Sequence, residues 1–302
     1  MQEIPHFEDH HHDHAEPRTP FLQFFLITLA EIGVALGLFY LIAPGMFRYE
    51  ATMPLAILGW ILILGLPMSL FEYFYHRYIL HSSILPFMKS QHRSHSTHHG
   101  LTNVKAAVSP KEPEKLAEVD SNYPIIEEHQ EESMMFPWYA LPIFYVIFVG
   151  VLGIPFKLMF PAAPIIMSTI IATTIYLVGY EMWHAILHFP YEKFWRPLME
   201  SRKVGKTVRH VYSFHLMHHW RPTTNLAVVG YWGIALWDHV FRTHKRPQMI
   251  PLDKGQVRYL DCEISKPRWP INVIDGWEKG MYKFSRSVEK GVARLVGIKP
   301  KA

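Results

Sequence analysis

The chain has 302 residues, of which 49% are hydrophobic and 14% aromatic. Its mean hydropathy is slightly positive although both ends are polar, which predicts very apolar blocks between the ends and argues against a soluble fold. The single cysteine, Cys262, excludes an internal disulfide and any cysteine-based zinc motif. The isoelectric point of about 9.0 does not indicate nucleic-acid binding, because the basic residues form no compact patch. The unusual feature of the composition is its 20 histidines.

Four apolar blocks are long enough to cross a bilayer, which takes about 20 residues at 1.5 Å each. The expected spans are residues 21–43, 52–74, 136–155 and 161–181. The short connections within each pair predict two helical hairpins in an all-α integral membrane protein. Of the 30 Lys and Arg residues, all but Arg48 and Lys157 fall on the side that also holds every histidine. The positive-inside rule therefore places both termini and the histidines in the cytoplasm, at a bacterial inner membrane or the endoplasmic reticulum.

We divide the chain into a polar, histidine-rich tail (1–20), a membrane domain (21–245) and a basic C-terminal segment (246–302). Residues 109–135 are acidic and predict a solvated loop with a short helix. Residues 226–241 are apolar but interrupted by glycines, which predicts a re-entrant or interfacial helix over the site. Residues 271–296 place apolar side chains every three or four positions, on one face of a helix, with lysine and arginine on the opposite face. That pattern fits either a helix on an anionic membrane surface or an ordinary packing helix.

Ten histidines occur in four clusters that follow the second and fourth spans. They are His76, His81, His95, His98, His99, His184, His188, His215, His218 and His219. Within three of the clusters the spacing is three or four residues, which places the side chains on one face of a helix. His76 and His81 are five apart, or about 140° on a regular helix. They could bind one centre only across a helix end, or else bind two different metals.

Ten imidazoles exceed the four to six ligands that one ion takes, which favours a pair of metals. Neutral imidazole suits iron, zinc, copper or nickel. Glu72 and Glu181 precede His76 and His184 on the same helical faces, so we expect each to accept the second ring N–H of a metal-bound histidine. Glu31, inside the first span, is costly there and needs a partner or a polar cavity. Four further histidines near the clusters are interpreted as supporting or structural: His92, His210, His239 and His244.

These motifs resemble the fatty acid hydroxylase superfamily of histidine-rich membrane enzymes, most closely the fatty acid 2-hydroxylases, with sterol desaturases as relatives. The resemblance covers about residues 70–245 and is carried by EYFYHRYILH (72–81), HSTHH (95–99), YEMWHAILHF (180–189), HLMHH (215–219) and LWDHVFRT (236–243). Glu181 stands where the family usually has aspartate. The resemblance implies a helical cytosolic cap in which all ten histidines bind two iron ions. It also implies that the active enzyme inserts oxygen from O₂ into an acyl C–H bond.

Many eukaryotic relatives carry a fused cytochrome b5 domain with an HPGG motif, which this sequence lacks. We therefore expect a separate electron donor, cytochrome b5-like or ferredoxin-like, and a membrane lipid as substrate. Purified protein could carry zinc instead of iron. Sterol methyl oxidation, sterol desaturation and lipid headgroup hydroxylation remain alternatives. A metal transporter is an alternative of another class, although transporters place their ligands near mid-membrane, at broken helices.

Basic residues near the clusters could steer an acidic donor or a lipid headgroup, or could reflect membrane topology alone. They are Arg202, Lys203, Lys206, Arg209 and Arg221.

Overall fold

The computed structural model describes residues 21–82, 84, 88–101, 116–118, 136–189, 191–245, 256–258 and 266–295. Within these ranges the protein is almost wholly helical. Besides the turns and loops between helices, the exceptions are two three-residue strands, β1 (Leu116–Glu118) and β2 (Gln256–Arg258), which pair antiparallel with Leu116 opposite Arg258. The sequence did not predict this pair. The predicted N-terminal tail and most of the predicted acidic loop lie outside the described residues.

Four stretches of helix are long and apolar enough to cross a membrane: Leu22–Ile42, Pro54–Leu80, Ala140–Met159 and Ile165–Leu187. They correspond to α1 (Phe21–Ile42), to α3 (Pro54–Tyr75) with the π-helix η1 (His76–Leu80), to α6 (Ala140–Phe148) with η3 (Val149–Gly153) and α7 (Ile154–Met159), and to α8 (Ile165–Leu187). The predicted number of membrane-length apolar helices is confirmed. The second and fourth end later than expected, at Leu80 and Leu187, because their helices continue into the histidine clusters.

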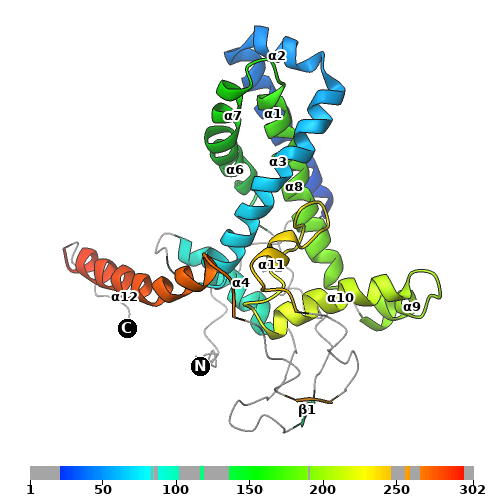
Figure 1. Ribbon diagram of the computed structural model, residues 1–302. Helices are drawn as coiled ribbons and strands as arrows, with labels where there is room; N and C mark the ends of the chain where they lie inside the picture. Colours follow the sequence, from blue (N-terminus) through cyan, green and yellow to red (C-terminus); the bar gives the residue numbers. More distant parts are fainter. Residues whose placement is uncertain are drawn as a thin grey trace.

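Helix α8 is the centre of the bundle, against which α3, α6 and α1 pack (Figure 1). Within the apolar layer its buried Ser and Thr side chains are small, and each of their hydroxyls donates to a carbonyl oxygen one turn earlier. The bonds from Thr169, Thr173 and Thr174 measure 2.8, 2.7 and 3.0 Å. Small, internally satisfied side chains let neighbouring helices approach α8 closely without leaving an unpaired polar group in an apolar layer.

A buried ion pair joins the connections at one end of the bundle. Glu50, in α2 (Pro44–Ala51), is fully buried and lies 2.6 Å from the ammonium of Lys157 in α7. Glu50 also accepts the backbone N–H of Met167 at 2.8 Å, and Lys157 donates to the carbonyl of Ala163. The two basic residues predicted for this side are thus Arg48 and a lysine whose charge is neutralised within the fold.

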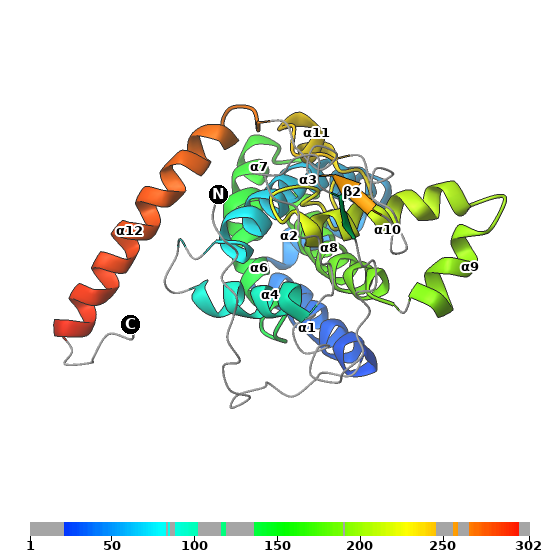
Figure 2. The same cartoon turned by 90° about the horizontal axis from the view of Figure 1, so that it is seen from below.

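The remaining helices gather at the opposite end of the bundle (Figures 1 and 2). They are α4 (Lys89–Leu101), η4 (Tyr191–Trp195), α9 (Arg196–Met199), α10 (Gly205–Trp220), α11 (Leu236–Val240) and α12 (Ile271–Leu295). In Figure 2, which looks along the bundle, α12 extends beyond the outline of the other helices.

The helix predicted at 226–241 is wrong except for the five residues of α11. The preceding stretch is a folded loop in which Gly230, Trp232 and Gly233 have positive φ values of 56°, 48° and 92°. Left-handed residues cannot continue an α-helix, so the chain turns back on itself here. The loop lies close to α3: a Cβ built on Gly65 would fall 2.2 Å from Nε1 of Trp232. Glycine at 65 therefore allows the loop to approach the span.

Candidate metal centre

All ten histidines of the four clusters converge at the end of the bundle in two groups of five. Group one comprises His76, His81, His95, His99 and His218, and group two comprises His98, His184, His188, His215 and His219. Within each group, one ring nitrogen from every histidine lies within 4.8 Å of all the others. Each group could hold a metal ion. The structure therefore brings together all ten histidines that the sequence predicted as metal ligands.

The two groups share their helices, which places them side by side. In α4, His98 belongs to group two, whereas its neighbours His95 and His99 belong to group one. In α10, His218 belongs to group one, whereas His215 and His219 belong to group two. The ends of the spans are not shared: α3 leads only into group one and α8 only into group two. Across the boundary, the rings of His99 and His219 stack with their centroids 4.2 Å apart.

The unusual spacing of His76 and His81 is explained by the π-helix η1. The backbone N–H of His81 donates to the carbonyl of His76 at 3.1 Å, a bond across five residues. One turn of π-helix therefore brings the two side chains together, with ring centroids 5.0 Å apart and nearly parallel. Of the two alternatives for this pair, the structure favours a single centre, because both histidines lie in group one.

Distances between ring nitrogens fit ligands that converge on a common ion. Nitrogens bound at about 2.0–2.1 Å, with angles of about 90–109° between the bonds, would lie roughly 2.9–3.4 Å apart. In group one the Nε2 atoms of His76 and His95 are 3.1 Å apart, those of His81 and His95 3.0 Å, and those of His81 and His218 3.1 Å. In group two, His188–His215, His215–His219 and His98–His219 are separated by 3.0, 3.1 and 3.2 Å.

Two backbone carbonyls fix which ring nitrogen faces group one. His76 donates its Nδ1–H to the carbonyl of Leu226 at 2.5 Å, and His218 donates its Nδ1–H to that of Thr224 at 2.9 Å. A neutral imidazole carries one proton, so the Nε2 of each presents a lone pair to the group. The lone pairs of His76 and His218 are thus directed into a group of five imidazoles, where a metal ion could accept them. This arrangement therefore supports a metal ion at group one.

Burial keeps these imidazoles neutral. For seven of the histidines outside the spans, burial first and then repulsion among the neighbouring imidazoles lower the pKa well below the ordinary value of 6.5. They are His81, His95, His98, His99, His215, His218 and His219. The backbone hydrogen bonds of His99 and His218 oppose this effect only in part. Neutral imidazole is the form that binds a metal ion, so the apoprotein is prepared for metal without releasing protons from these rings.

The expected role of Glu72 is wrong in its detail. Its carboxylate does not receive an N–H from His76. It accepts the backbone N–H groups of Val228, Val229 and Gly230 at 2.6, 3.0 and 2.8 Å, together with the hydroxyl of Tyr176. The same loop contains the Leu226 carbonyl that orients His76. Glu72 thus acts on group one through the loop that it holds.

Glu181 also makes a different contact from the one expected. One of its oxygens accepts the backbone N–H of Phe136 at 3.2 Å, which ties the start of the third span to α8. The ring of Phe136 packs on Tyr180, which in turn packs on His184. Glu181 therefore helps to position the aromatic rings of Phe136 and Tyr180, which pack beside His184 of group two.

Asp238 is a supporting residue that the ligand pattern did not reveal. It is fully buried, accepts the N–H groups of Leu226 and Ala227 at 3.0 Å each, and accepts the hydroxyl of Thr243 at 2.7 Å. Glu72 and Asp238 thus hold the two ends of one short loop. The signal available in the sequence was the LWDHVFRT stretch, which contains both Asp238 and Thr243.

The four histidines interpreted as supporting or structural lie outside both groups. His92 donates from Nδ1 to the carbonyl of Leu80 at 2.8 Å, which fixes α4 against the end of η1. His239 and His244 stack with ring centroids 4.1 Å apart, and His210 lies farther along the same stack. These contacts fit the structural interpretation.

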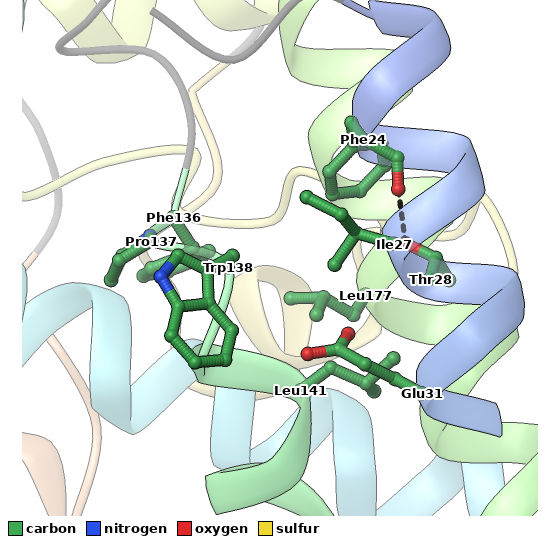
Figure 3. A pocket seen from close by; sticks show the side chains of 9 residues that line it. All are labelled: Phe24, Ile27, Thr28, Glu31, Phe136, Pro137, Trp138, Leu141 and Leu177. Carbon is green, nitrogen blue, oxygen red and sulfur yellow. Dashed lines mark hydrogen bonds between the residues drawn. The ribbon is translucent and has the colours of Figure 1, made fainter. Parts of the chain in front are cut away.

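Glu31 lines a narrow pocket between α1, the start of α6 and α8 (Figure 3). Its neighbours there are almost all apolar, and the one other hydroxyl, that of Thr28, already donates to the carbonyl of Phe24. The Oε1 atom of Glu31 is buried and has no hydrogen-bond partner among the described residues. The expected partner is thus absent from the described part of the chain, and the cavity around the carboxylate is mainly apolar.

The fold and the site together define a helical protein with four membrane-length helices and two adjacent, buried groups of five histidines that could bind metal ions. The chain matches no protein-family model, no curated protein and no solved structure.

Proposed function

We propose that this protein is a membrane di-iron monooxygenase of the fatty acid hydroxylase type, which hydroxylates a C–H bond of an acyl chain or lipid. The observation that carries the proposal is the convergence of ten imidazoles, with no other ligand type among them, into two adjacent groups of five. Imidazole without thiolate suits redox-active iron and gives no preference for a structural zinc. The motifs that resemble the superfamily supply all ten of these ligands.

Two iron ions, one for each group, would supply the activation of O₂ that no amino-acid side chain can perform. The chain contributes orientation and protection from water. The carbonyls of Leu226 and Thr224 hold two imidazoles in the correct tautomer, and Glu72 and Asp238 hold the loop that carries the first of these carbonyls. All ten rings are buried or half-buried, which limits access of bulk water to the centre.

We further propose that the four apolar helices form two hairpins in the membrane and that the histidine-bearing helices form a cytosolic cap. The asymmetric distribution of lysine and arginine supports this orientation. In such an arrangement the two groups lie where α3 and α8 leave the bilayer, within reach of a lipid chain. Arg202, Lys203, Lys206 and Arg209 are exposed at and before the start of α10, where an acidic electron donor could dock.

The experiment compares membrane lipids, by high-resolution mass spectrometry, from cells that express wild type, His98→Ala or His239→Ala. His98 belongs to group two, and His239 is a matched control outside both groups. We expect a lipid that gains one oxygen atom in wild type and in the control but not in His98→Ala. A lipid that loses two hydrogen atoms would show that the reaction is desaturation and not hydroxylation. An oxidised sterol or an oxidised lipid headgroup would identify a different substrate.

Identical lipidomes from cells whose protein is folded and iron-loaded would refute the proposed activity. Metal content, measured on the purified variants by mass spectrometry, separates this result from a failure to load iron. Transmembrane metal flux in proteoliposomes, with loss of bound metal, would instead favour the transporter.

A further inference from the structure

Helix α12 is attached to the protein by its first two turns, at the end of a span. Asp275 accepts two bonds from the guanidinium of Arg77, at 2.7 and 3.0 Å, and Glu278 accepts the hydroxyl of Ser82 at 2.7 Å. Arg77 and Ser82 bracket Leu80, the last residue of the second apolar stretch. The contacts therefore place the start of α12 where α3 leaves the apolar layer.

Beyond this attachment α12 extends away from the bundle. It has 25 residues and is thus about 37 Å long at 1.5 Å per residue. Figure 1 shows it lying across the direction of the four spans, and Figure 2 shows it beside the bundle instead of beneath it.

A stripe of large apolar side chains along α12 is exposed. Trp277, Met281, Phe284, Val288 and Val292 have 68%, 45%, 64%, 46% and 53% of their surface accessible. At 100° per residue these positions fall within about 80° of one another around the helix axis. Of the two sequence interpretations of this segment, the exposure favours a helix on a membrane surface, because the apolar stripe is not packed against the described part of the protein.

Basic side chains occupy the opposite side of the same helix. Lys283 and Lys290 are exposed and Arg286 is half-buried, and their positions centre roughly 170° from the apolar stripe. The side that contacts the protein, marked by Asp275 and Glu278, lies at about right angles to both. Because α12 lies beside the bundle and across the spans, this arrangement allows one stripe to face the apolar layer around the spans while the other faces away from it.

We propose that the apolar stripe of α12 inserts into the cytosolic surface of an anionic bilayer, with its basic residues among the phosphate groups of the lipids. This inference rests on the membrane placement proposed above. Helices with a strongly apolar face and a basic face take this position at membrane surfaces. Tryptophan, here Trp277, is favoured at the boundary between hydrocarbon and headgroups. A second copy spanning the same bilayer would hold its own α12 in the same plane, so it could not cover a stripe that faces the lipid.

The inference is tested by placing a spin label along α12 in full-length protein in nanodiscs. In a Cys262→Ser background, single cysteines replace apolar-stripe residues (Phe284→Cys or Val288→Cys) or basic residues (Lys283→Cys or Lys290→Cys). Each label's accessibility to O₂, which concentrates in hydrocarbon, is compared with its accessibility to a water-soluble nickel complex. Bound metal and resistance to carbonate extraction show that each variant keeps its fold and its membrane insertion.

We expect labels at 284 and 288 to give an O₂-to-nickel ratio several-fold higher than labels at 283 and 290 in phosphatidylglycerol nanodiscs. The ratio should fall in phosphatidylcholine or in high salt, because the electrostatic contribution is screened. Equal, water-like ratios at all four positions in carbonate-resistant protein would overturn the inference. So would dipolar broadening between labels at 284, which would identify a second copy as the occupant. Extraction of wild type by carbonate would instead refute the membrane placement itself.

Discussion

Replacement of Glu72 by glutamine tests how the protein orients group one. In wild type, one carboxylate oxygen accepts the N–H groups of Val228 and Val229, and the other accepts the N–H of Gly230 and the hydroxyl of Tyr176. A glutamine amide keeps one accepting oxygen and presents an NH₂ group to the other pair of donors. The less costly orientation turns this NH₂ group toward Gly230 and Tyr176, because the Tyr176 hydroxyl can donate instead to the Gly230 carbonyl 2.9 Å away. The buried N–H of Gly230 then loses its acceptor.

A buried donor left without a partner costs about 1–3 kcal/mol, so Glu72→Gln should lower the free energy of unfolding by about that amount. The loosened loop carries the Leu226 carbonyl, which holds His76. Loss of such a supporting contact typically weakens metal binding about 10–100-fold. The reduction should be specific to group one, because the structure gives Glu72 no contact with the histidines of group two.

The assay is a metal titration of purified apoprotein, with the thermal midpoint of unfolding measured in parallel. We expect wild type to bind two equivalents tightly and Glu72→Gln to bind one tightly and one weakly. Glu181→Gln is the control, because among the described residues Glu181 accepts the N–H of Phe136 alone and lies in the neighbourhood of group two. Equal weakening of both equivalents in Glu72→Gln, or unchanged binding despite lowered stability, would refute the assignment of Glu72 to group one.

Three further predictions concern stability. Lys157→Met should lower the free energy of unfolding by about 3–5 kcal/mol by leaving Glu50 buried and unpaired; recovery in the Lys157→Met/Glu50→Leu double variant, measured by thermal unfolding, would confirm this cause, and a neutral single variant would contradict it. Glu31→Leu should raise the free energy of unfolding by about 1–3 kcal/mol by removing an unpartnered buried oxygen, and a lower melting temperature would show that Glu31 has a partner. Metal-free protein should lose stability as the pH falls below about 6.5. Histidines of the unfolded chain bind protons in this range, whereas the buried histidines of the folded protein stay neutral because their pKa values are lowered. A thermal midpoint that stays constant from about pH 8 to about pH 5.5 would contradict this last prediction.

The sequence by itself determined the number of spans and the identity of the ligand candidates. Span length follows from apolar composition, and the shared helical faces follow from spacings of three and four residues, both of which are local properties. It also identified Glu31 as a residue in need of explanation. The resemblance to a known superfamily named the same ten histidines.

Only the tertiary structure decided how those ten histidines divide. His98 and His99 are adjacent, so their side chains point about 100° apart and reach different groups, but spacing does not say which other helices meet them there. The pairing of His76 with His81 depended on a π-helix, which leaves no periodic signal in the sequence.

The partners of Glu72 were equally beyond the sequence, because its acceptor bonds go to backbone groups more than 150 residues away along the chain. Backbone N–H groups are the same in every residue type, so a loop that uses them leaves no mark in composition or spacing. The apolar pattern of α12 was visible from the start. Whether that face packs on the protein or remains open depended on where the helix leaves the bundle, which is a property of the assembled fold.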